Sequence, residues 1–195
     1  MRESWDQFYL LTKDKPPSAG LLQAISLLDH IGGEALDLGC GAGRDTRYLL
    51  QRGFRVTAVD QEEASLAALT TLSTGKLTLV QAAFEDFSFA TYELINAHFA
   101  LPFIAKEQFT TVFDRLKQSL KPGGIVVGQF FGINDEWNTN TNHLTFFTRA
   151  QALAQLEGLR IITFEEEDAD GRTTEGSAKH WHIYHIIARK PTSLD

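Results

Sequence analysis

Residues 35–44 read ALDLGCGAGR, a short apolar run that passes into three glycines alternating with Cys40 and Ala42. A helical apolar pattern begins at Arg44. Because glycine lacks a Cβ, such a turn adopts backbone angles closed to other residues and lets a ligand approach the main chain. The helix that follows directs unpaired N–H groups and a partial positive charge at the same place. The stretch therefore predicts a strand–turn–helix unit that binds a ligand bearing a carboxylate or a phosphate.

The spacing of the glycines distinguishes two kinds of nucleotide-binding unit. The dinucleotide fingerprint has glycines at its first, third and sixth positions, whereas the sixth position counted from Gly39 is Arg44, a bulky cation. The spacing Gly39, Gly41 and Gly43, with Asp37 two residues upstream, resembles motif I of the class I S-adenosylmethionine (SAM)-dependent methyltransferases. The resemblance implies that this turn wraps the methionine end of SAM. The same residues also fit a tight strand–helix junction that binds nothing.

The resemblance implies roles for the polar residues at this turn. Asp37 is expected to orient the glycine turn or to meet the methionine ammonium. Arg44 is expected to pair with the methionine carboxylate, or else to face solvent in the first turn of its helix. The turn residues expected to contact the cofactor are Gly39, Cys40, Gly41 and Gly43.

A second acidic residue lies about 20 positions beyond the glycine turn. Residues 54–60 read FRVTAVD, a buried strand that ends in Asp60. An acid at this distance is the expected partner of ribose hydroxyls in a Rossmann-type unit, because a carboxylate accepts two hydrogen bonds from a cis-diol. Asp60 is therefore the predicted ribose contact, with Gln61 beside it. Asp60 could instead cap the following helix, and both roles can hold together.

The loop after the third predicted strand is expected to face the adenine ring. Relatives in the family commonly place an acid at the position of Ala83, which cannot accept a hydrogen bond from the adenine amino group. Phe84 can still offer its backbone N–H and an apolar face, and Glu85 or Asp86 could replace the missing acid or belong to a solvated turn. Asn96, near the end of the fourth predicted strand, completes the expected cofactor contacts.

Strands and helices alternate along the chain, which predicts an α/β fold with a parallel sheet covered on both faces. Two final strands, at 159–166 and 181–189, enclose a polar loop at 168–179 and should pair as an antiparallel hairpin. This ending resembles the class I methyltransferase fold, a Rossmann-like, mostly parallel seven-stranded sheet with an antiparallel last strand. The other expected strands are 35–38, 54–59, 76–82, 92–97 and 125–130, and the expected helices are 19–30, 44–52, 62–72, 106–120 and 148–156.

A length of 195 residues with 43% hydrophobic residues predicts one domain with one core. Residues 1–33 are expected to form a helical lead whose aromatic part closes over the site as a lid. Residues 34–132 are the predicted SAM-binding core. Residues 133–195 are expected to supply the acceptor-side elements and the hairpin.

The net charge of −7 argues against a nucleic-acid partner, which would need a basic face. Cys40 is the one cysteine, so no intrachain disulfide can form, as is usual in a reducing compartment. Residues 1–6 lack the apolar core of a signal peptide, and no apolar run is long enough to cross a bilayer. We therefore expect a cytoplasmic protein that acts on a small molecule, without a membrane or nucleic-acid partner.

Polar and aromatic residues gather in the last third of the chain, at 132–137, 142–147 and 179–185. Together they resemble the tellurite-resistance-like branch of small-molecule methyltransferases, some of which have a late Lys-His-Trp-His segment. The candidate acceptor-side catalytic residues are His98, His180 and His182, although a lone histidine more often has a structural role. The candidate substrate contacts are Tyr9, Phe99, Trp137, His143 and Trp181, some of which could equally be packing residues.

No metal site is predicted. At strand spacing His180 and His182 share one face while His185 points to the other, and the single cysteine leaves no compact zinc spacing.

The sequence predicts a SAM-dependent methyltransferase that moves a methyl group to a small acceptor by in-line displacement and releases S-adenosylhomocysteine. A non-catalytic SAM-binding regulator and, less favoured, an NAD-dependent oxidoreductase are the alternatives. The acceptor and the oligomeric state are left open.

Overall fold

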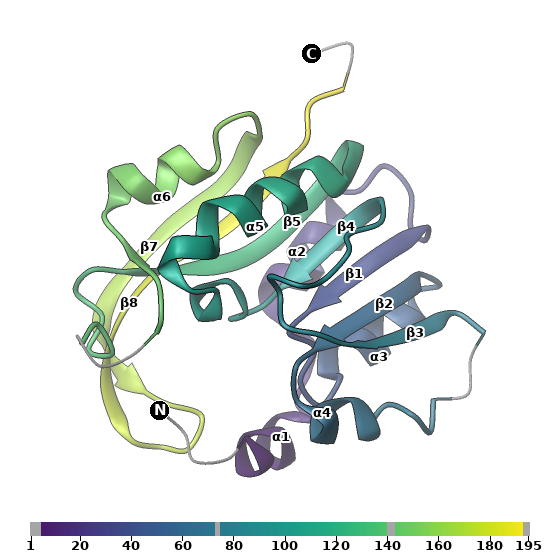
Figure 1. The fold of residues 1–195 in the computed structure, drawn as a ribbon, viewed down its shortest axis with the longest axis horizontal. Coiled ribbons are helices and arrows are strands. Elements are labelled where there is room, and N and C mark those ends of the chain that lie inside the picture. Colours follow the sequence, from purple (N-terminus) through teal and green to yellow (C-terminus); the bar gives the residue numbers. More distant parts are fainter. Residues whose placement is uncertain (1–4, 73–74, 140–142, 193–195) are drawn as a thin grey trace.

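A computed structural model describes residues 5–72, 75–139 and 143–192 of the chain (Figure 1). In this described part, eight strands form one sheet in the order β3-β2-β1-β4-β5-β8-β7, and β6 adds to the end of β5. The first five strands are parallel, whereas β8 runs antiparallel to both β5 and β7. The strands are β1 Glu34–Leu38, β2 Arg55–Asp60, β3 Leu77–Gln81, β4 Tyr92–Ala97, β5 Leu120–Gly132, β6 Phe146–Phe147, β7 Arg160–Arg172 and β8 Ala178–Arg189.

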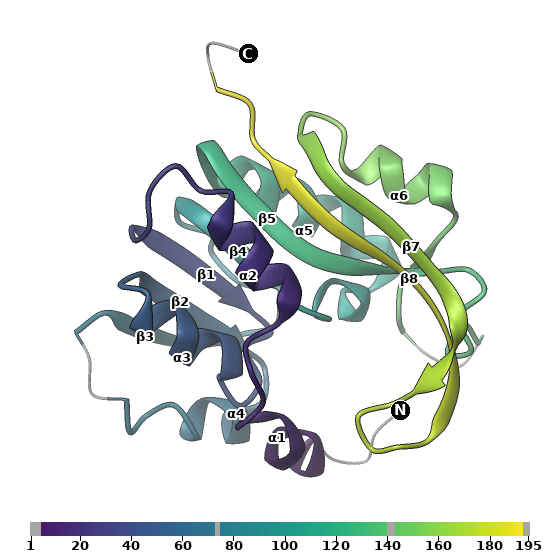
Figure 2. The same ribbon diagram turned by 180° about the vertical axis from the view of Figure 1, so that it is seen from behind.

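Helices cover both faces of the sheet, and each face has its own apolar core. Figure 1 shows α5 and α6 in front of the sheet, and Figure 2 shows α2 and α3 on the opposite face. The parallel, doubly covered arrangement predicted from the alternation of elements is thereby confirmed. The helices are α1 Asp6–Thr12, α2 Ala19–Ser26, α3 Arg44–Gln51, α4 Glu63–Ala67, the 3-10 turn η1 Leu101–Phe103, α5 Lys106–Ser119 and α6 Arg149–Gln155.

The β7–β8 hairpin is longer than the sequence predicts. The expected polar loop at 168–179 belongs mostly to the two strands, and only residues 173–177 form the turn. The polar residues there pair across the ladder, since His180 lies 2.8 Å from carboxylates of both Asp168 and Asp170. The predicted loop at 168–179 was too long, because a run of polar residues on an exposed strand has the same composition as a loop. The two-residue strand β6 was also not predicted.

Several element ends differ from the prediction. Strand β5 begins at Leu120, not at residue 125. Helix α2 ends at Ser26, and α4 ends at Ala67. Helix α6 begins with a capping box, because the Thr148 hydroxyl accepts from Gln151 N and the Gln151 side chain accepts from Thr148 N.

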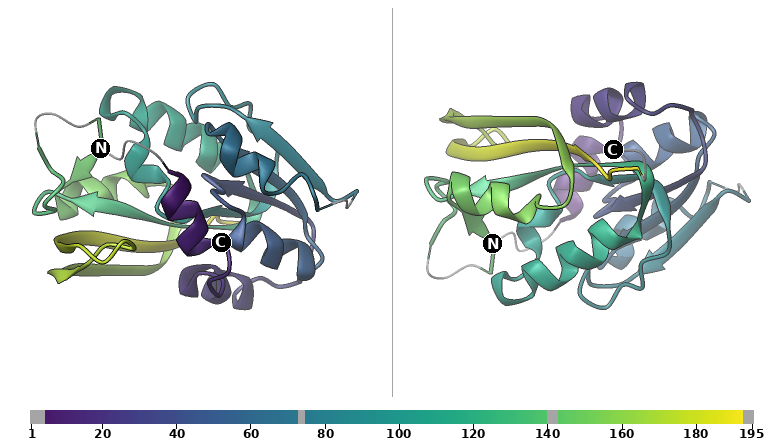
Figure 3. Two further views of the ribbon diagram at one scale, coloured as in Figure 1. Left: turned by 90° about the horizontal axis from the view of Figure 1, so that it is seen from below. Right: turned by 90° about the horizontal axis from the view of Figure 1, so that it is seen from above.

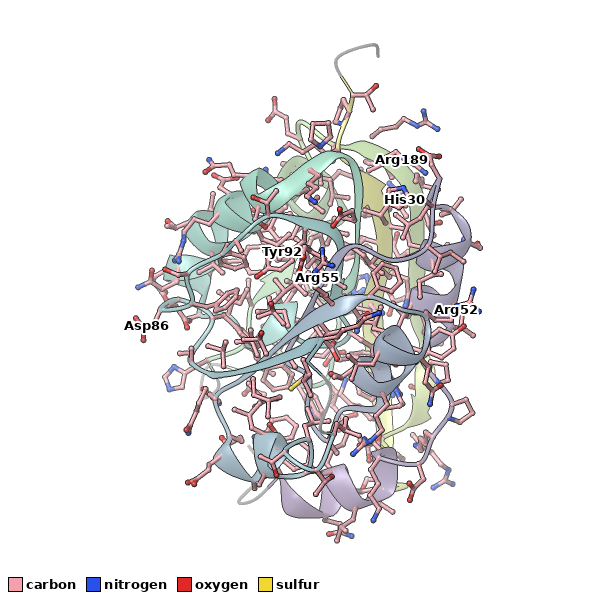
Figure 4. The ribbon with its side chains drawn as sticks, turned by 90° about the vertical axis from the view of Figure 1, so that its right-hand side faces the viewer. His30, Arg52, Arg55, Asp86, Tyr92 and Arg189 are labelled. Atoms are coloured by element: carbon pink, nitrogen blue, oxygen red, sulfur yellow. The ribbon has the colours of Figure 1, made fainter. Side chains whose placement is uncertain are left out.

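The hairpin turn and α1 both lie at the end of the sheet where the parallel strands finish. Seen from below (Figure 3, left), α1 lies between the hairpin and the part of the sheet that carries α3 and α4. Figure 4 shows His30 and Arg189 at the opposite end of the molecule, where Arg189 donates to the carbonyl oxygens of Leu27 and Gly123. No helix within the described residues combines the length and the apolarity that a membrane span requires.

Candidate active site

A cavity of about 480 Å³ opens beyond the carboxyl ends of the parallel strands. Residues after β1, β2, β3 and β4 line one part of it, and α1, the end of β5 and the hairpin line the rest. Open α/β sheets bind ligands at this edge. The fold therefore brings the predicted cofactor motifs and the aromatic residues of the hairpin to one place.

The glycine turn has the backbone that its sequence predicts. Gly39, Gly41 and Gly43 have φ of 72°, 50° and 78°, in the left-handed region that favours glycine. Gly39 and Gly41 line the cavity with Cys40, whereas Gly43 does not. A Cβ on Gly43 would lie 2.0 Å from Leu69 Cδ2. The expected contact of Gly43 with the cofactor is thus corrected: Gly43 lets α3 begin tightly against Leu69.

Asp60 is buried at the end of β2 and lines the same cavity. Its Oδ2 accepts from the Gly41 backbone N–H at 2.8 Å, and its Oδ1 accepts from the Glu62 backbone N–H at 3.0 Å. The residue at the N-cap of α4 is Glu62, not Asp60. Asp60 therefore binds backbone donors on both sides while its carboxylate faces the cavity beside Gln61, which also lines it.

Two buried carboxylates lie together behind the turn. Asn96 Nδ2 donates to Asp37 Oδ1 at 2.8 Å and to Asp45 Oδ2 at 3.2 Å. Thr46 Oγ1 donates to Asp37 Oδ2 at 2.5 Å. Burial, together with the negative charge of Asp45, raises the pKa of Asp37 to about 7. Asp37 thus lies among donors that fix its orientation at the cavity wall.

Asp45 connects this pair to α2 and to Arg44. It accepts from the backbone N–H of Ser18 at 2.9 Å and from the Ser18 hydroxyl at 2.8 Å. Burial alone would raise the pKa of Asp45, but the hydrogen bonds and charge of Arg44 hold this pKa below its usual value. The Arg44 guanidinium lines the cavity bound to both Asp45 oxygens, at 3.0 and 3.1 Å. Of the two alternatives given for Arg44, the solvent-facing one does not hold, because the side chain is mostly buried against Asp45.

Asn96 lines the cavity and has a buried acceptor without a partner. The residue is 1% exposed, and its Oδ1 has no hydrogen-bond partner in the described structure. A buried carbonyl oxygen without a partner costs about 1–3 kcal/mol. A donor group on a bound ligand would remove this cost.

The loop after β3 reaches the cavity through Ala83, Phe84 and Glu85. Arg115 holds this loop by donating to the carbonyl oxygens of Glu85, at 2.7 Å, and of Phe87. Asp86 is exposed and points outward in Figure 4, so it does not replace the acid missing at position 83. Glu85 is half-buried and is the carboxylate of this loop that faces the cavity.

His98 follows β4 and lines the cavity. Gln129 Nε2 lies 3.4 Å from His98 Nδ1, and Gln129 Oε1 accepts from the Phe99 backbone N–H at 2.7 Å. Burial and the positive charge of Arg44 lower the pKa of His98 to about 4, so the imidazole is neutral at pH 7. Because an amide nitrogen only donates, Gln129 favours the tautomer that has its proton on Nε2.

The histidines of β8 lie away from the cavity. His182 is buried, accepts from the Asn134 backbone N–H at 3.1 Å and lies 3.0 Å from a Glu166 oxygen. Strand alternation directs Trp181 and Ile183 into the cavity instead. This corrects the expectation that His180 and His182 reach the acceptor. His143 is exposed and does not line the cavity either.

Comparison with known proteins agrees with this geometry. Residues 35–124 match a family described as a methyltransferase domain. That segment contains the glycine turn, Asp60 and Asn96. The match covers a little less than half of the chain, and it agrees with the resemblance to SAM-dependent methyltransferases that the glycine turn carries.

Individual relatives of this chain are distant. The chain is 30% identical over 95 residues to a Haemophilus influenzae protein named as the probable S-adenosyl-L-methionine-dependent methyltransferase TehB, covering 47% of this chain and 33% of the relative. The crystal structure of TehB from Haemophilus influenzae superposes with a TM-score of 0.75 at 18% identity, over 89% of this chain and 62% of that one. N-methyltransferase NodS from Bradyrhizobium japonicum in complex with S-adenosylhomocysteine has a TM-score of 0.68 at 17% identity, over 95% and 97%.

The chain spans only about a third to a half of the length of the curated relatives it matches. The likeness to the solved structures shows the fold, which confirms the predicted Rossmann-like sheet with its antiparallel end.

Sequence reasoning missed several residues that line the cavity. Asp45 follows Arg44 directly, and an acid in the first turn of the helix after the glycine turn is the signal that could have indicated it. Phe131 lies at the end of β5, inside an apolar run that reads only as core. The predicted contacts Tyr9, Phe99, Trp137 and Trp181 do line the cavity, and so do Trp5, Phe8 and Phe103.

Proposed function

We propose that this chain transfers a methyl group from SAM to a small-molecule acceptor and releases S-adenosylhomocysteine. The observation that carries the proposal is the unpartnered Oδ1 of Asn96, a residue of the cavity wall whose amide nitrogen donates to the carboxyl groups of Asp37 and Asp45. Such a group of acceptors suits an ammonium, which brings three donors and a positive charge. The α-ammonium of a methionine moiety fits this requirement.

The other cavity residues suit the remaining parts of SAM. The Asp60 carboxylate, held by the N–H groups of Gly41 and Glu62, would accept hydrogen bonds from the ribose hydroxyls. Gly39 and Gly41 leave the main chain open to the methionine portion. Phe84 would offer an apolar face to the adenine ring. Glu85 would supply the carboxylate that accepts a hydrogen bond from the adenine amino group, which Ala83 cannot do.

When bound, SAM supplies a methyl group on a positively charged sulfur. An acceptor nucleophile takes this methyl group in line, and the sulfur is the leaving group. The chain's own task is to align the acceptor with that methyl group and to exclude water. Positioning of this kind contributes roughly 7–11 kcal/mol in the best intramolecular models. Phe99, Trp181 and Ile183 form apolar wall at the acceptor side. The neutral His98 imidazole would contact the acceptor and hold a proton on Nε2, directed away from Gln129.

Calorimetric titration of the protein with SAM, S-adenosylhomocysteine and NAD tests the proposal. We expect binding of SAM and of S-adenosylhomocysteine, but none of NAD. Binding of NAD without SAM would overturn the proposal in favour of an oxidoreductase. Incubation with SAM labelled in its methyl group, followed by mass spectrometry of a mixed metabolite extract, then identifies labelled products. SAM binding with no labelled product across a broad acceptor panel would indicate a regulator.

A further inference from the structure

Aromatic rings line the cavity from two sides. We infer that the acceptor is a flat, uncharged aromatic molecule that stacks between two sets of these rings. The inference rests on the proposed function, because it names the acceptor class for the same cavity. One set, here called the hairpin wall, comprises Phe99, Phe131, Trp137 and Trp181.

The rings of the hairpin wall contact one another as a continuous surface. The centroids of Trp137 and Trp181 are 5.3 Å apart, and that of Phe131 lies 6.0 and 6.1 Å from them. Phe99 extends the surface, at 6.2 Å from both Phe131 and Trp181. Phe99 has a φ of 52°, and among the described residues no other non-glycine residue has a positive φ. Such strain persists only where surrounding structure imposes it, commonly at ligand sites.

A second aromatic cluster faces the cavity from α1, from the residue before it and from η1. Trp5 lies 5.6 Å from Phe8, 6.3 Å from Tyr9 and 5.4 Å from Phe103, measured between ring centroids. All four side chains line the same cavity as the hairpin wall. Figure 2 shows α1 and the β7–β8 turn as separate segments at the same end of the molecule. A planar ring inserted between the two aromatic sets would gain stacking or edge contacts with both.

Lys179 argues against a cationic acceptor. Its Nζ lies 3.5 Å from the Trp181 ring centroid and 4.5 Å from that of Trp137, and the lysine side chain is 1% exposed. The ammonium pairs with Asp135 at 2.5 Å and does not line the cavity. Because these rings already bind a buried cation, a second cation would meet a weakened attraction.

The charges that line the cavity argue against an oxyanion. Arg44 is bound to Asp45, and Arg172 donates to the Gly176 carbonyl oxygen at 2.7 Å. Lys15 is the remaining cationic lining residue among those described. Against these three cations stand the carboxyl groups of Asp37, Asp45, Asp60, Glu62, Glu85 and Glu167. An uncharged acceptor avoids repulsion from the Lys179 ammonium and from the carboxylates that line the cavity.

The hairpin also offers a polar contact that could orient such an acceptor. Thr173 lines the cavity at the hairpin turn, and its Oγ1 is buried without a hydrogen-bond partner in the described structure. A ring substituent that donates or accepts a hydrogen bond would satisfy this hydroxyl. His98 directly precedes Phe99 and lines the same cavity. The centroids of the two rings are 4.9 Å apart, so the imidazole offers a second polar group beside the hairpin wall.

The test compares 2-naphthol, which is planar and aromatic, with decahydro-2-naphthol, which has the same carbon skeleton but is saturated and puckered, by equilibrium binding in the presence of S-adenosylhomocysteine. We expect 2-naphthol to bind at least tenfold more tightly. Trp181→Leu and Trp137→Leu should each reduce this preference about three- to tenfold, in line with the energy of an aromatic pair. Trp181→Phe should retain most of it. Phe164→Leu is the control, because Phe164 stacks on Tyr184 outside the cavity.

Equal binding of the two alcohols, binding of neither, or a preference unchanged in both tryptophan variants would overturn the inference. Thermal unfolding of each variant shows that it is folded. SAM affinity is measured separately for the same proteins. If the unmodified protein does not bind SAM, the proposed function is overturned. The naphthol comparison reports on the aromatic walls alone.

Discussion

The backbone N–H of Gly41 donates to Asp60 Oδ2 across 2.8 Å, which joins the turn after β1 to the end of β2. The carboxylate is buried, and its second oxygen accepts from Glu62 N. Asp60 is thereby fixed by the main chain before any ligand arrives. Such preorganisation lowers the entropy that a bound ligand must lose.

Replacing Asp60 by alanine should weaken SAM binding by about 1–3 kcal/mol, because a charged acceptor of hydrogen bonds is lost. The same change leaves Gly41 N and Glu62 N without their partner. Calorimetry with SAM measures the effect, and Asp86→Asn, on the exposed side of the next loop, is the control. An unchanged affinity in a folded Asp60→Ala protein would reduce Asp60 to a local backbone contact.

Gly43→Ala should destabilise the protein more than Gly53→Ala does. Both glycines have positive φ, 78° and 93°, so alanine is strained at either position by about 1–2 kcal/mol. A Cβ at residue 43 would also lie 2.0 Å from Leu69, whereas nothing lies within 4 Å of one at residue 53. Denaturant unfolding of the two variants isolates the steric part. Equal losses would show that Leu69 moves aside freely.

The lining of the cavity around the glycine turn could be predicted because its signals are local in the sequence. The glycine spacing and the acid of residue 60 each occur within a few residues of a strand end, and parallel strands bring such ends together. The partners of these residues could not be predicted. Ser18 and Asp45 are 27 positions apart, and only the packing of α2 against the sheet makes them neighbours.

The lining of the cavity on the hairpin side was predicted less well because its residues depend on register. A shift of one residue moves every side chain of a strand to the other face. The pairing of Asp168 with His182 and of Ala169 with Trp181 directs the tryptophan, not the histidine, into the cavity. The Lys-His-Trp-His segment at 179–182 is visible in the sequence, but the sequence does not say which of its side chains face the cavity.

The raised pKa of Asp37 predicts a specific dependence of stability on pH. Burial and the charge of Asp45 raise this pKa from 3.8 to about 7 in the folded protein. Between these values the folded state binds more protons than the unfolded state, so the free energy of unfolding falls as pH rises from about 4 to about 7. Asp37→Asn removes the titration and should flatten this part of the profile.

Denaturant unfolding at pH 5 and pH 7.5 checks the Asp37 prediction, with Asp86→Asn as the matched control. The control should keep the slope of the unmodified protein. A profile for Asp37→Asn that runs parallel to that of the unmodified protein would show that another buried group causes the slope.

His182→Ala should lower stability while leaving SAM affinity unchanged. The imidazole is buried, accepts from Asn134 N and packs on Gly132, where a Cβ would lie 2.3 Å from the ring. Its removal leaves a donor unpaired and opens a cavity, a loss of about 1–3 kcal/mol. His185→Ala is the control, since its pair with Glu167 is partly exposed and contributes at most about 1 kcal/mol. A stable His182→Ala protein that binds SAM but loses methyl transfer would instead return this histidine to the acceptor site.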